Sequence, residues 1–234
     1  MKTIIIDAGH GGTDPGATAF GIKEKDWNLK MSQHQFERLK ELGVKVEMTR
    51  ISDITLHPTP IVEQIKNKYD YCISNHFNAF DGSARGVETI HSIYADSHFA
   101  KKLATAIAQK TQLPFRRTFS KKNEANTDWY FMHRLTGRTE TVIIEYGFLD
   151  NKADFDYYKN EENFKQAAEV VVKVICEQIG KAYHPPKQTI KSQANQGNLP
   201  IYRVQVGAFH KKENADKQVQ QLKKAGFDAI VTTH

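Results

Sequence analysis

The segment KTIIIDAGHGG, residues 2–12, sets the expectation for the fold. Its first half, residues 2–7, is apolar and β-branched, which predicts a buried strand. That strand runs directly into Gly9-His10-Gly11-Gly12, a flexible turn that carries a histidine. Glycines let the backbone approach a substrate or a ligand closely. The segment therefore predicts a strand that delivers a polar turn to the end of a sheet.

Apolar strands and amphipathic helices alternate over the following residues. Residues 25–42 have apolar side chains at helical spacing and end before Gly43, and residues 163–179 form a second long amphipathic pattern that ends before Gly180. Shorter patterns predict strands at residues 44–48, 69–74, 86–94 and 141–144 and helices at residues 61–68 and 99–109. The alternation predicts an α/β fold with a mostly parallel sheet sandwiched by helices.

Three polar residues, His10, His76 and Glu145, each follow directly after an apolar strand in this interpretation. Parallel sheets place their sites at the carboxyl ends of the strands, so we expect the three side chains to converge. Taken singly, each has an ordinary structural explanation as a loop histidine, a strand-end histidine or an ion-paired carboxylate. Their shared position at strand ends favours a functional site.

Two histidines and a carboxylate are a common ligand set for catalytic zinc, which leaves a fourth position for water. Glu24 is the best third ligand, because it precedes the first amphipathic helix close to the His10 turn. The alternative for Glu24 is a carboxylate favoured by the helix dipole. Glu145 would be partly buried, and burial raises the pKa of a carboxyl group, which suits a proton shuttle. An ion pair or a fourth metal ligand are the alternatives for Glu145.

The composition changes after residue 181. Residues 182–200 are rich in Pro, Gln and Asn and predict a linker between a catalytic domain, residues 1–181, and a small unit, residues 201–234. The patterns of that unit predict a βαβ arrangement with strands at 201–208 and 227–233 and a helix at 211–225. Such a unit is small for a stable domain.

The basic residues are concentrated in this last quarter. Residues 181–234 carry nine Lys/Arg and three Asp/Glu, a net charge of +6, whereas residues 1–180 are balanced. A basic appendage on a neutral body suggests attraction to a polyanion such as nucleic acid, an anionic membrane or a teichoic-acid-bearing wall, and a solubilising surface is the alternative. Cys72 and Cys176 form no disulfide framework or metal motif and are predicted to be buried free thiols.

Four motifs together resemble the zinc-dependent N-acetylmuramoyl-L-alanine amidases, which occur as autolysins, sporulation lysins and phage endolysins. They are residues 7–17 (DAGHGGTDPGA), Glu24-Lys25, residues 74–79 (SNHFNA) and residues 145–149 (EYGFL). The resemblance covers about residues 2–180 and implies the α/β fold. It implies His10, Glu24 and His76 as ligands of Zn2+ and Glu145 as the catalytic carboxylate. Asn78 also lies at a motif position, and we expect it beside the metal ligands without assigning it a role.

The C-terminal unit resembles one SPOR-type repeat through residues 201–209, 214–216 and 225–229. Modules of that kind bind peptidoglycan, and their usual fold has two βαβ halves, of which this chain shows one. An unpaired half exposes strand edges and an apolar helix face, so we predict a homodimer through residues 201–234. The alternatives are a half-module that docks on its own catalytic domain and one that stays disordered.

The predicted function is hydrolysis of peptidoglycan at the amide between the lactyl group of N-acetylmuramic acid and L-alanine. The alternatives are another zinc hydrolase acting on wall peptides or sugars and a non-catalytic wall-binding protein. No nucleic acid partner is expected. No apolar run approaches the roughly 20 residues of a membrane span, and the N-terminus lacks a secretory signal pattern. We therefore expect synthesis in the cytoplasm and action on the wall after release, by a phage or by mother-cell lysis.

Overall fold

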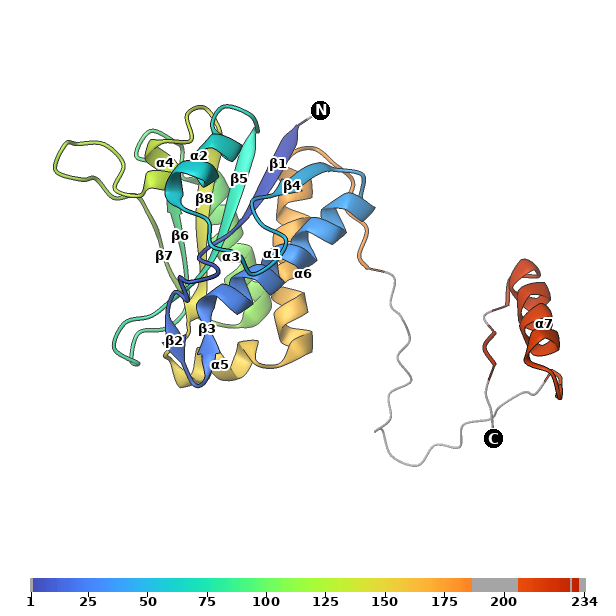
Figure 1. The fold of residues 1–234 in the computed structure, drawn as a ribbon. Helices are drawn as coiled ribbons and strands as arrows, with labels where there is room; N and C mark the ends of the chain where they lie inside the picture. The colour runs from blue at the N-terminus through green and yellow to red at the C-terminus, as the bar shows by residue number, and fades with distance from the viewer. Residues whose placement is uncertain (1, 187–205, 228, 232–234) are drawn as a thin grey trace. The chain divides into compact units, whose positions relative to one another are not determined.

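The computed structural model describes residues 2–186, 206–227 and 229–231. The chain divides into two compact units, Met1–Pro186 and Lys187–His234. The first unit holds a six-stranded sheet with helices on both faces, and the second holds one described helix (Figure 1).

The central sheet has the strand order β4-β1-β5-β8-β6-β7. Strands β1, β4, β5 and β8 are parallel, β6 pairs with β8 in the antiparallel sense, and β7 pairs with β6 in parallel. Their bounds are β1 Thr3–Ala8, β4 Lys45–Met48, β5 Tyr71–Asn78, β6 Val87–His91, β7 Phe115–Phe119 and β8 Glu140–Phe148. A short hairpin of β2, Thr18–Ala19, and β3, Ile22–Lys23, precedes the first helix. The mostly parallel α/β sheet confirms the predicted fold class.

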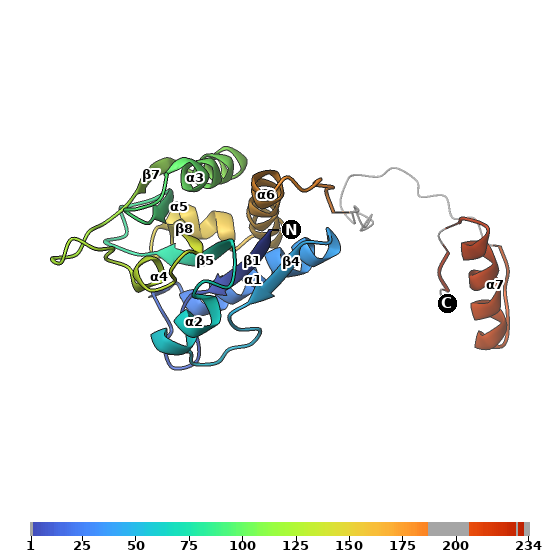
Figure 2. The same cartoon turned by 90° about the horizontal axis from the view of Figure 1, so that it is seen from above.

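Helices cover both faces of this sheet (Figure 2). Their bounds are α1 Glu24–Glu41, α2 Pro58–Ile65, α3 His98–Thr111, α4 Phe131–Arg134, α5 Lys152–Tyr158 and α6 Glu161–Gln178. The larger core lies between the sheet and α1, α3, α5 and α6, and the smaller core lies under α2 and α4. Ile4 and Ile6 of β1 face the larger core and Ile5 faces the smaller one, which explains why this strand is apolar at consecutive positions. Cys72 and Cys176 are buried and free, as predicted.

Two predicted strand ends were wrong. Strand β5 continues through His76 to Asn78, and β8 continues through Glu145 to Phe148, so both site candidates lie inside strands rather than after them. The reason is that β5 lies between β1 and β8, and their ladder hydrogen bonds hold polar residues in the sheet despite the loss of apolar character. Strand β7 was not predicted, because Arg116 and Arg117 interrupt its apolar pattern at the exposed edge of the sheet.

A buried polar network joins α1 to β5 and β8 below the carboxyl ends of the strands. The hydroxyl of Tyr146 donates to Asn75 Oδ1 (2.7 Å) and accepts from Gln35 Nε2 (2.6 Å). Asn75 Nδ2 donates in turn to Ser32 Oγ and Gln35 Oε1, both at 2.8 Å. Polar groups removed from water need such partners, so this network fixes how α1 sits on the sheet.

The second unit contains α7, Lys212–Lys224, which confirms the helix predicted at residues 211–225. Most of the predicted linker and of the two predicted strands lies outside the described residues. Residues 206–209 and 229–231, which are described, do not belong to a strand. Across the described parts of the chain, no helix is long and apolar enough to cross a membrane.

Removing the hydroxyl of Tyr146 tests the buried network. Tyr146→Phe leaves the buried Asn75 Oδ1 and Gln35 Nε2 without the hydroxyl that they contact, and we expect the free energy of unfolding to fall by about 1–3 kcal/mol. Urea denaturation measures this change. Tyr94→Phe is the control, because Tyr94 is 77% exposed and its free energy of unfolding should change by less than about 0.5 kcal/mol. Equal stability of Tyr146→Phe and the native protein would contradict the role assigned to the network.

Candidate metal centre and active site

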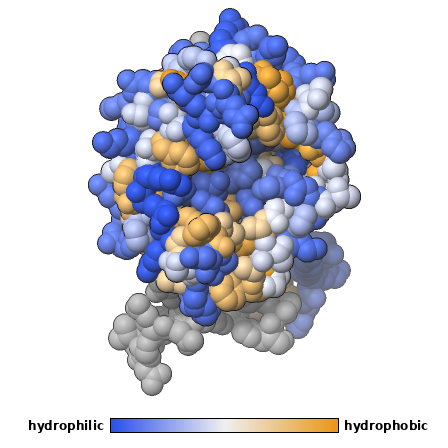
Figure 3. All heavy atoms as spheres, turned by 90° about the vertical axis from the view of Figure 1, so that its left-hand side faces the viewer, coloured by the Kyte–Doolittle hydropathy of each residue, from blue (hydrophilic) through white to orange (hydrophobic). Residues whose placement is uncertain are grey.

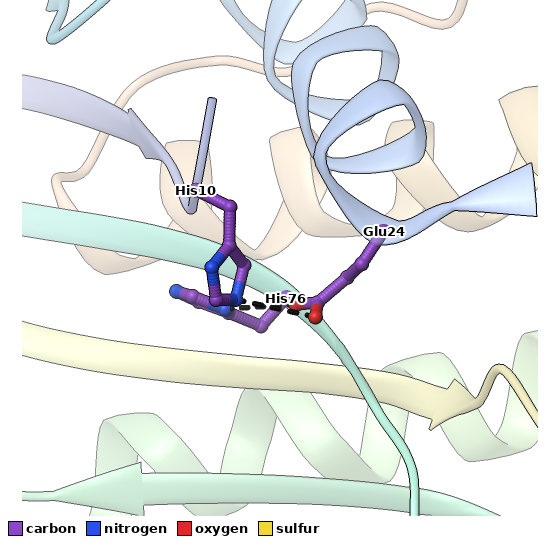
Figure 4. A group of neighbouring side chains, drawn as sticks. All are labelled: His10, Glu24 and His76. Carbon is purple, nitrogen blue, oxygen red and sulfur yellow. Dashed lines mark hydrogen bonds and ion pairs between the residues drawn. The ribbon is translucent and has the colours of Figure 1, made fainter. Parts of the chain in front are cut away.

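His10 lies in the turn that follows β1 and points toward the start of α1 (Figure 4). Its backbone has a φ of 60°, and Gly11 and Gly12 on its C-terminal side also have positive φ. His10 Nδ1 hydrogen-bonds to Asp14 Oδ2 at 2.8 Å, which orients the ring and leaves Nε2 3.2 Å from Glu24 Oε2. The glycine-rich turn thus serves to present one imidazole nitrogen to Glu24.

Glu24 is the first residue of α1 and is only 4% exposed. Its Oε2 accepts a hydrogen bond from the backbone N–H of Ala17 at 2.9 Å. Its Oε1 accepts from the backbone N–H of Phe77 and from Asn28 Nδ2, each at 3.1 Å. Burial would raise the pKa of Glu24, but its hydrogen bonds with the two histidines outweigh burial and hold the pKa well below its usual range. The carboxylate is therefore charged, fixed and faced by both histidines.

His76 reaches the same carboxylate from β5 (Figure 4). His76 Nδ1 lies 3.0 Å from Glu24 Oε1. Burial favours the neutral imidazole, yet the hydrogen bond with Glu24 and the surrounding carboxylates raise the pKa of His76 to about 9. The ring packs over Gly9, where an added Cβ would lie 2.1 Å from a ring carbon. Glycine at position 9 therefore leaves the space that His76 occupies.

One atom from each of His10, Glu24 and His76 lies within 4.8 Å of the others, and this is the only such group of His, Cys, Asp or Glu among the described residues. Two imidazole nitrogens and a carboxylate oxygen suit zinc and leave one coordination position open. The guanidinium of Arg50 donates to the carbonyls of Ala8, Gly9 and Lys25. These bonds join the turn after β1 to the start of α1. The residues present thus fit a zinc ion held by three protein ligands.

Glu145 lies directly beside His76, because the two residues are paired in the ladder between β5 and β8. It is partly buried, and its Oε2 is enclosed with no hydrogen-bond partner in the described residues. Burial is the main cause that raises the pKa of Glu145 to about 8, and nearby carboxylates act in the same direction against the two histidines. A carboxyl group with a pKa near neutrality is suited to accept and return a proton.

The cross-strand pairing that joins His76 to Glu145 continues to Glu88, which is paired with Glu145 between β6 and β8. Pattern reasoning missed Glu88, because the alternation of residues 86–94 indicated only a strand. Asn78 does not hydrogen-bond to the three candidate ligands; its Nδ2 donates to Glu88 Oε2 at 3.2 Å. Asp14 and Arg50, which position the histidine turn, were not singled out either, and only the position of Asp14 within the first motif hinted at its role.

The chain matches two known protein families. Residues 4–177 match the N-acetylmuramoyl-L-alanine amidase family, and residues 177–233 match the SPOR domain. This chain belongs to the N-acetylmuramoyl-L-alanine amidase family. Both matches confirm the resemblance seen in the sequence, to the amidases and to the SPOR domain. They favour the amidase class over another zinc hydrolase and over a non-catalytic wall-binding protein.

Several relatives of this amidase share most of its length. The YqiI protein of Bacillus subtilis is 33% identical over 173 residues, which cover 73% of this chain and 82% of that protein. The sporulation-specific N-acetylmuramoyl-L-alanine amidase of Bacillus subtilis is 25% identical over 244 residues, which cover 99% of this chain and 84% of the relative. The catalytic domain of the amidase CwlV from Paenibacillus polymyxa superposes with a TM-score of 0.70 at 26% identity, covering 78% of this amidase and all (100%) of that domain.

The space above Gly9 provides a test of the metal centre. Gly9→Ala should displace the His76 ring and lower zinc affinity by at least about tenfold, since misplacing one of three ligands disrupts the site. Zinc titration against a competing chelator measures the affinity. Gly21→Ala is the control, because its Cβ meets nothing within 4 Å although its φ is +78°. That variant should lose about 1–2 kcal/mol of stability and keep its zinc affinity. Native affinity in Gly9→Ala would contradict the assignment of His76.

Proposed function

We propose that this amidase hydrolyses the amide between the lactyl group of N-acetylmuramic acid and L-alanine with one zinc ion held by His10, Glu24 and His76. The observation that carries the proposal is the convergence of these three side chains beside an unpartnered carboxylate oxygen of Glu145. Zinc in such a site supplies Lewis acidity, which polarises a carbonyl group and makes water a stronger acid. No nucleophilic serine or cysteine is needed for this chemistry.

Glu145 acts as the proton carrier in this proposal. Its enclosed carboxylate accepts a proton from the attacking water and returns it to the nitrogen of the departing L-alanine. The pKa of about 8 supports this role, because the group gains and loses a proton near neutral pH. Glu24 keeps the negative charge of a zinc ligand, because the two histidines depress its pKa against the effect of burial. The N–H donors of Ala17, Phe77 and Asn28 hold the carboxylate in place.

The amidase activity and the SPOR domain imply that the chain binds peptidoglycan. We propose that the enzyme lyses the wall of the cell that produces it. The sporulation-specific amidase of Bacillus subtilis, which aligns over 99% of this chain, supports mother-cell lysis over phage release.

We also propose that the C-terminal unit pairs with a second copy. No residue of helix α7 is buried among the described residues of the second unit. Five apolar side chains around it are exposed, namely Val206, Phe209, Phe227, Ile230 and Val231. A two-fold contact between copies would cover these side chains and hold two catalytic units on one wall-binding module, which increases avidity for an insoluble polymer.

Substitutions distinguish the roles of the zinc ligands and of the Glu145 carboxylate. Purified enzyme should hold about one zinc per chain, as three protein ligands predict. Glu145→Gln should keep the zinc and lose about 10²–10⁴-fold in turnover of muropeptides, whereas His76→Ala should lose the zinc as well. Glu140→Gln on the same strand is the control and should retain native turnover, because it lies outside the site. A near-native rate in Glu145→Gln would show that another group carries the proton.

Light scattering tests the pairing of the C-terminal units. The full chain should have the mass of a dimer at micromolar concentration, and a chain ending at Pro186, which retains the first compact unit, should be a monomer. Phe227→Ser/Ile230→Ser in the full chain should weaken the dimer, because both substitutions remove apolar surface that the contact between copies would cover. A monomeric full chain, or a dimer that survives the truncation, would defeat the pairing.

A further inference from the structure

Glu88 lies on β6 one strand beyond Glu145 and is 1% exposed. It occupies the middle of a cross-strand row in which His76, Glu145, Glu88 and Arg117 are successive partners on β5, β8, β6 and β7. Residues paired in this way share one face of the sheet. The row therefore leads from the candidate zinc ligands, across the proton carrier, to an arginine at the edge of the sheet.

Two arginines converge on the Glu88 carboxylate. Arg116 Nε donates to Glu88 Oε1 at 2.6 Å, and Arg117 Nε donates to the same oxygen at 2.9 Å. Successive strand residues normally point to opposite faces, but the register between β6 and β7 shifts at Val87 and Glu88 and brings both arginines to one carboxylate. Glu88 Oε2 accepts from Asn78, so all of the described partners of Glu88 are donors held on β5 and β7.

The guanidinium groups are held in place yet remain open to solvent. That of Arg116 lies 5.3 Å from the ring centre of Phe148, and that of Arg117 lies 4.1 Å from the ring centre of Phe119. The arginine side chains are 42% and 54% exposed. Within the described part of the chain, the terminal nitrogens of Arg116 have no acceptor, and only Nη2 of Arg117 reaches Glu88, at 3.4 Å. N–H donors therefore remain available to a ligand at this edge of the sheet. The face of the molecule drawn in Figure 3 carries both hydrophilic and hydrophobic side chains.

The charges of this cluster do not cancel, because two guanidinium groups face one carboxylate. Pairing with charged donors stabilises the buried carboxylate of Glu88, but a single guanidinium group would balance its charge. Planar guanidinium donors match the geometry of a carboxylate and bind it with charge-assisted hydrogen bonds. Burial raises the pKa of Tyr130, and the charges of Glu145 and Glu88 act in the same direction against that of Arg117.

We propose that Arg116 and Arg117, held by Glu88, bind the free α-carboxylate of the second stem-peptide residue, D-isoglutamate, and so align the substrate with Glu145. The inference rests on the amidase reaction proposed above. Neighbouring strands are about 4.8 Å apart, and the arginines reach from β7 back to Glu88 on β6. A carboxylate bound by them therefore lies between one and two strand spacings, roughly 5–10 Å, from the proton carrier. The α-carboxylate of D-isoglutamate follows the scissile carbonyl by about two residue lengths, or roughly 7 Å of extended chain.

A pair of synthetic substrates tests this subsite with the full zinc-loaded chain. Muramoyl-L-Ala-D-isoglutamyl-L-Lys and its D-isoglutamine counterpart, both amidated at the lysine, differ only in the carboxylate in question. The native enzyme should prefer the free carboxylate by about tenfold or more in kcat/KM, as the loss of a charge-assisted hydrogen bond predicts. Arg116→Gln/Arg117→Gln should reduce the preference to about one.

Two further variants complete the test. The double variant leaves Glu88 buried with an unpaired charge, so Glu88→Gln/Arg116→Gln/Arg117→Gln, which removes that charge as well, is measured beside it and should also lose the preference. Arg85→Gln is the matched control, because Arg85 is likewise 42% exposed and pairs with Asp154 outside the row; it should keep the native preference. Equal native rates on the two substrates, or a preference that survives both variants, overturns the subsite. A native enzyme that cleaves neither substrate overturns the amidase mechanism itself.

Discussion

The buried carboxylate of Glu24 holds together parts of the chain that are far apart in sequence. Its two oxygens face the turn after β1 through His10 and strand β5 through His76, and they accept backbone N–H groups from Ala17 and Phe77. A charge at 4% exposure is unfavourable unless it is fully hydrogen-bonded. The segments around it must therefore keep this arrangement, and the same arrangement directs three ligand atoms at one point.

The parallel sheet places Glu145, the proposed proton carrier, next to that point. Glu145 is paired with His76 in the ladder between β5 and β8, so its position follows from strand register and not from a flexible loop. The polar network of Asn75, Gln35 and Tyr146 lies directly below and fixes α1, and with it Glu24, to the same two strands. Ligands on rigid elements supported by buried hydrogen bonds are the arrangement that precise chemistry requires.

The fold and the central site could be predicted from the sequence, because apolar strands and glycine-rich turns leave clear local patterns. His10, Glu24 and His76 were found in this way and through the motifs that accompany them, and the structure brings them together. Strand ends were less predictable, since β5 and β8 retain polar residues through ladder hydrogen bonds that no local pattern records. Glu88 was missed for a related reason. Its importance depends on its register partners Glu145 and Arg117, which lie on other strands.

Zinc K-edge X-ray absorption of the full chain measures directly whether His10, Glu24 and His76 converge on one metal. We predict a four-coordinate zinc with two imidazole ligands, a carboxylate oxygen and one further light atom, each at about 2.0–2.1 Å from the metal. A zinc spectrum without imidazole scattering, or with sulfur scattering at about 2.3 Å, would contradict it.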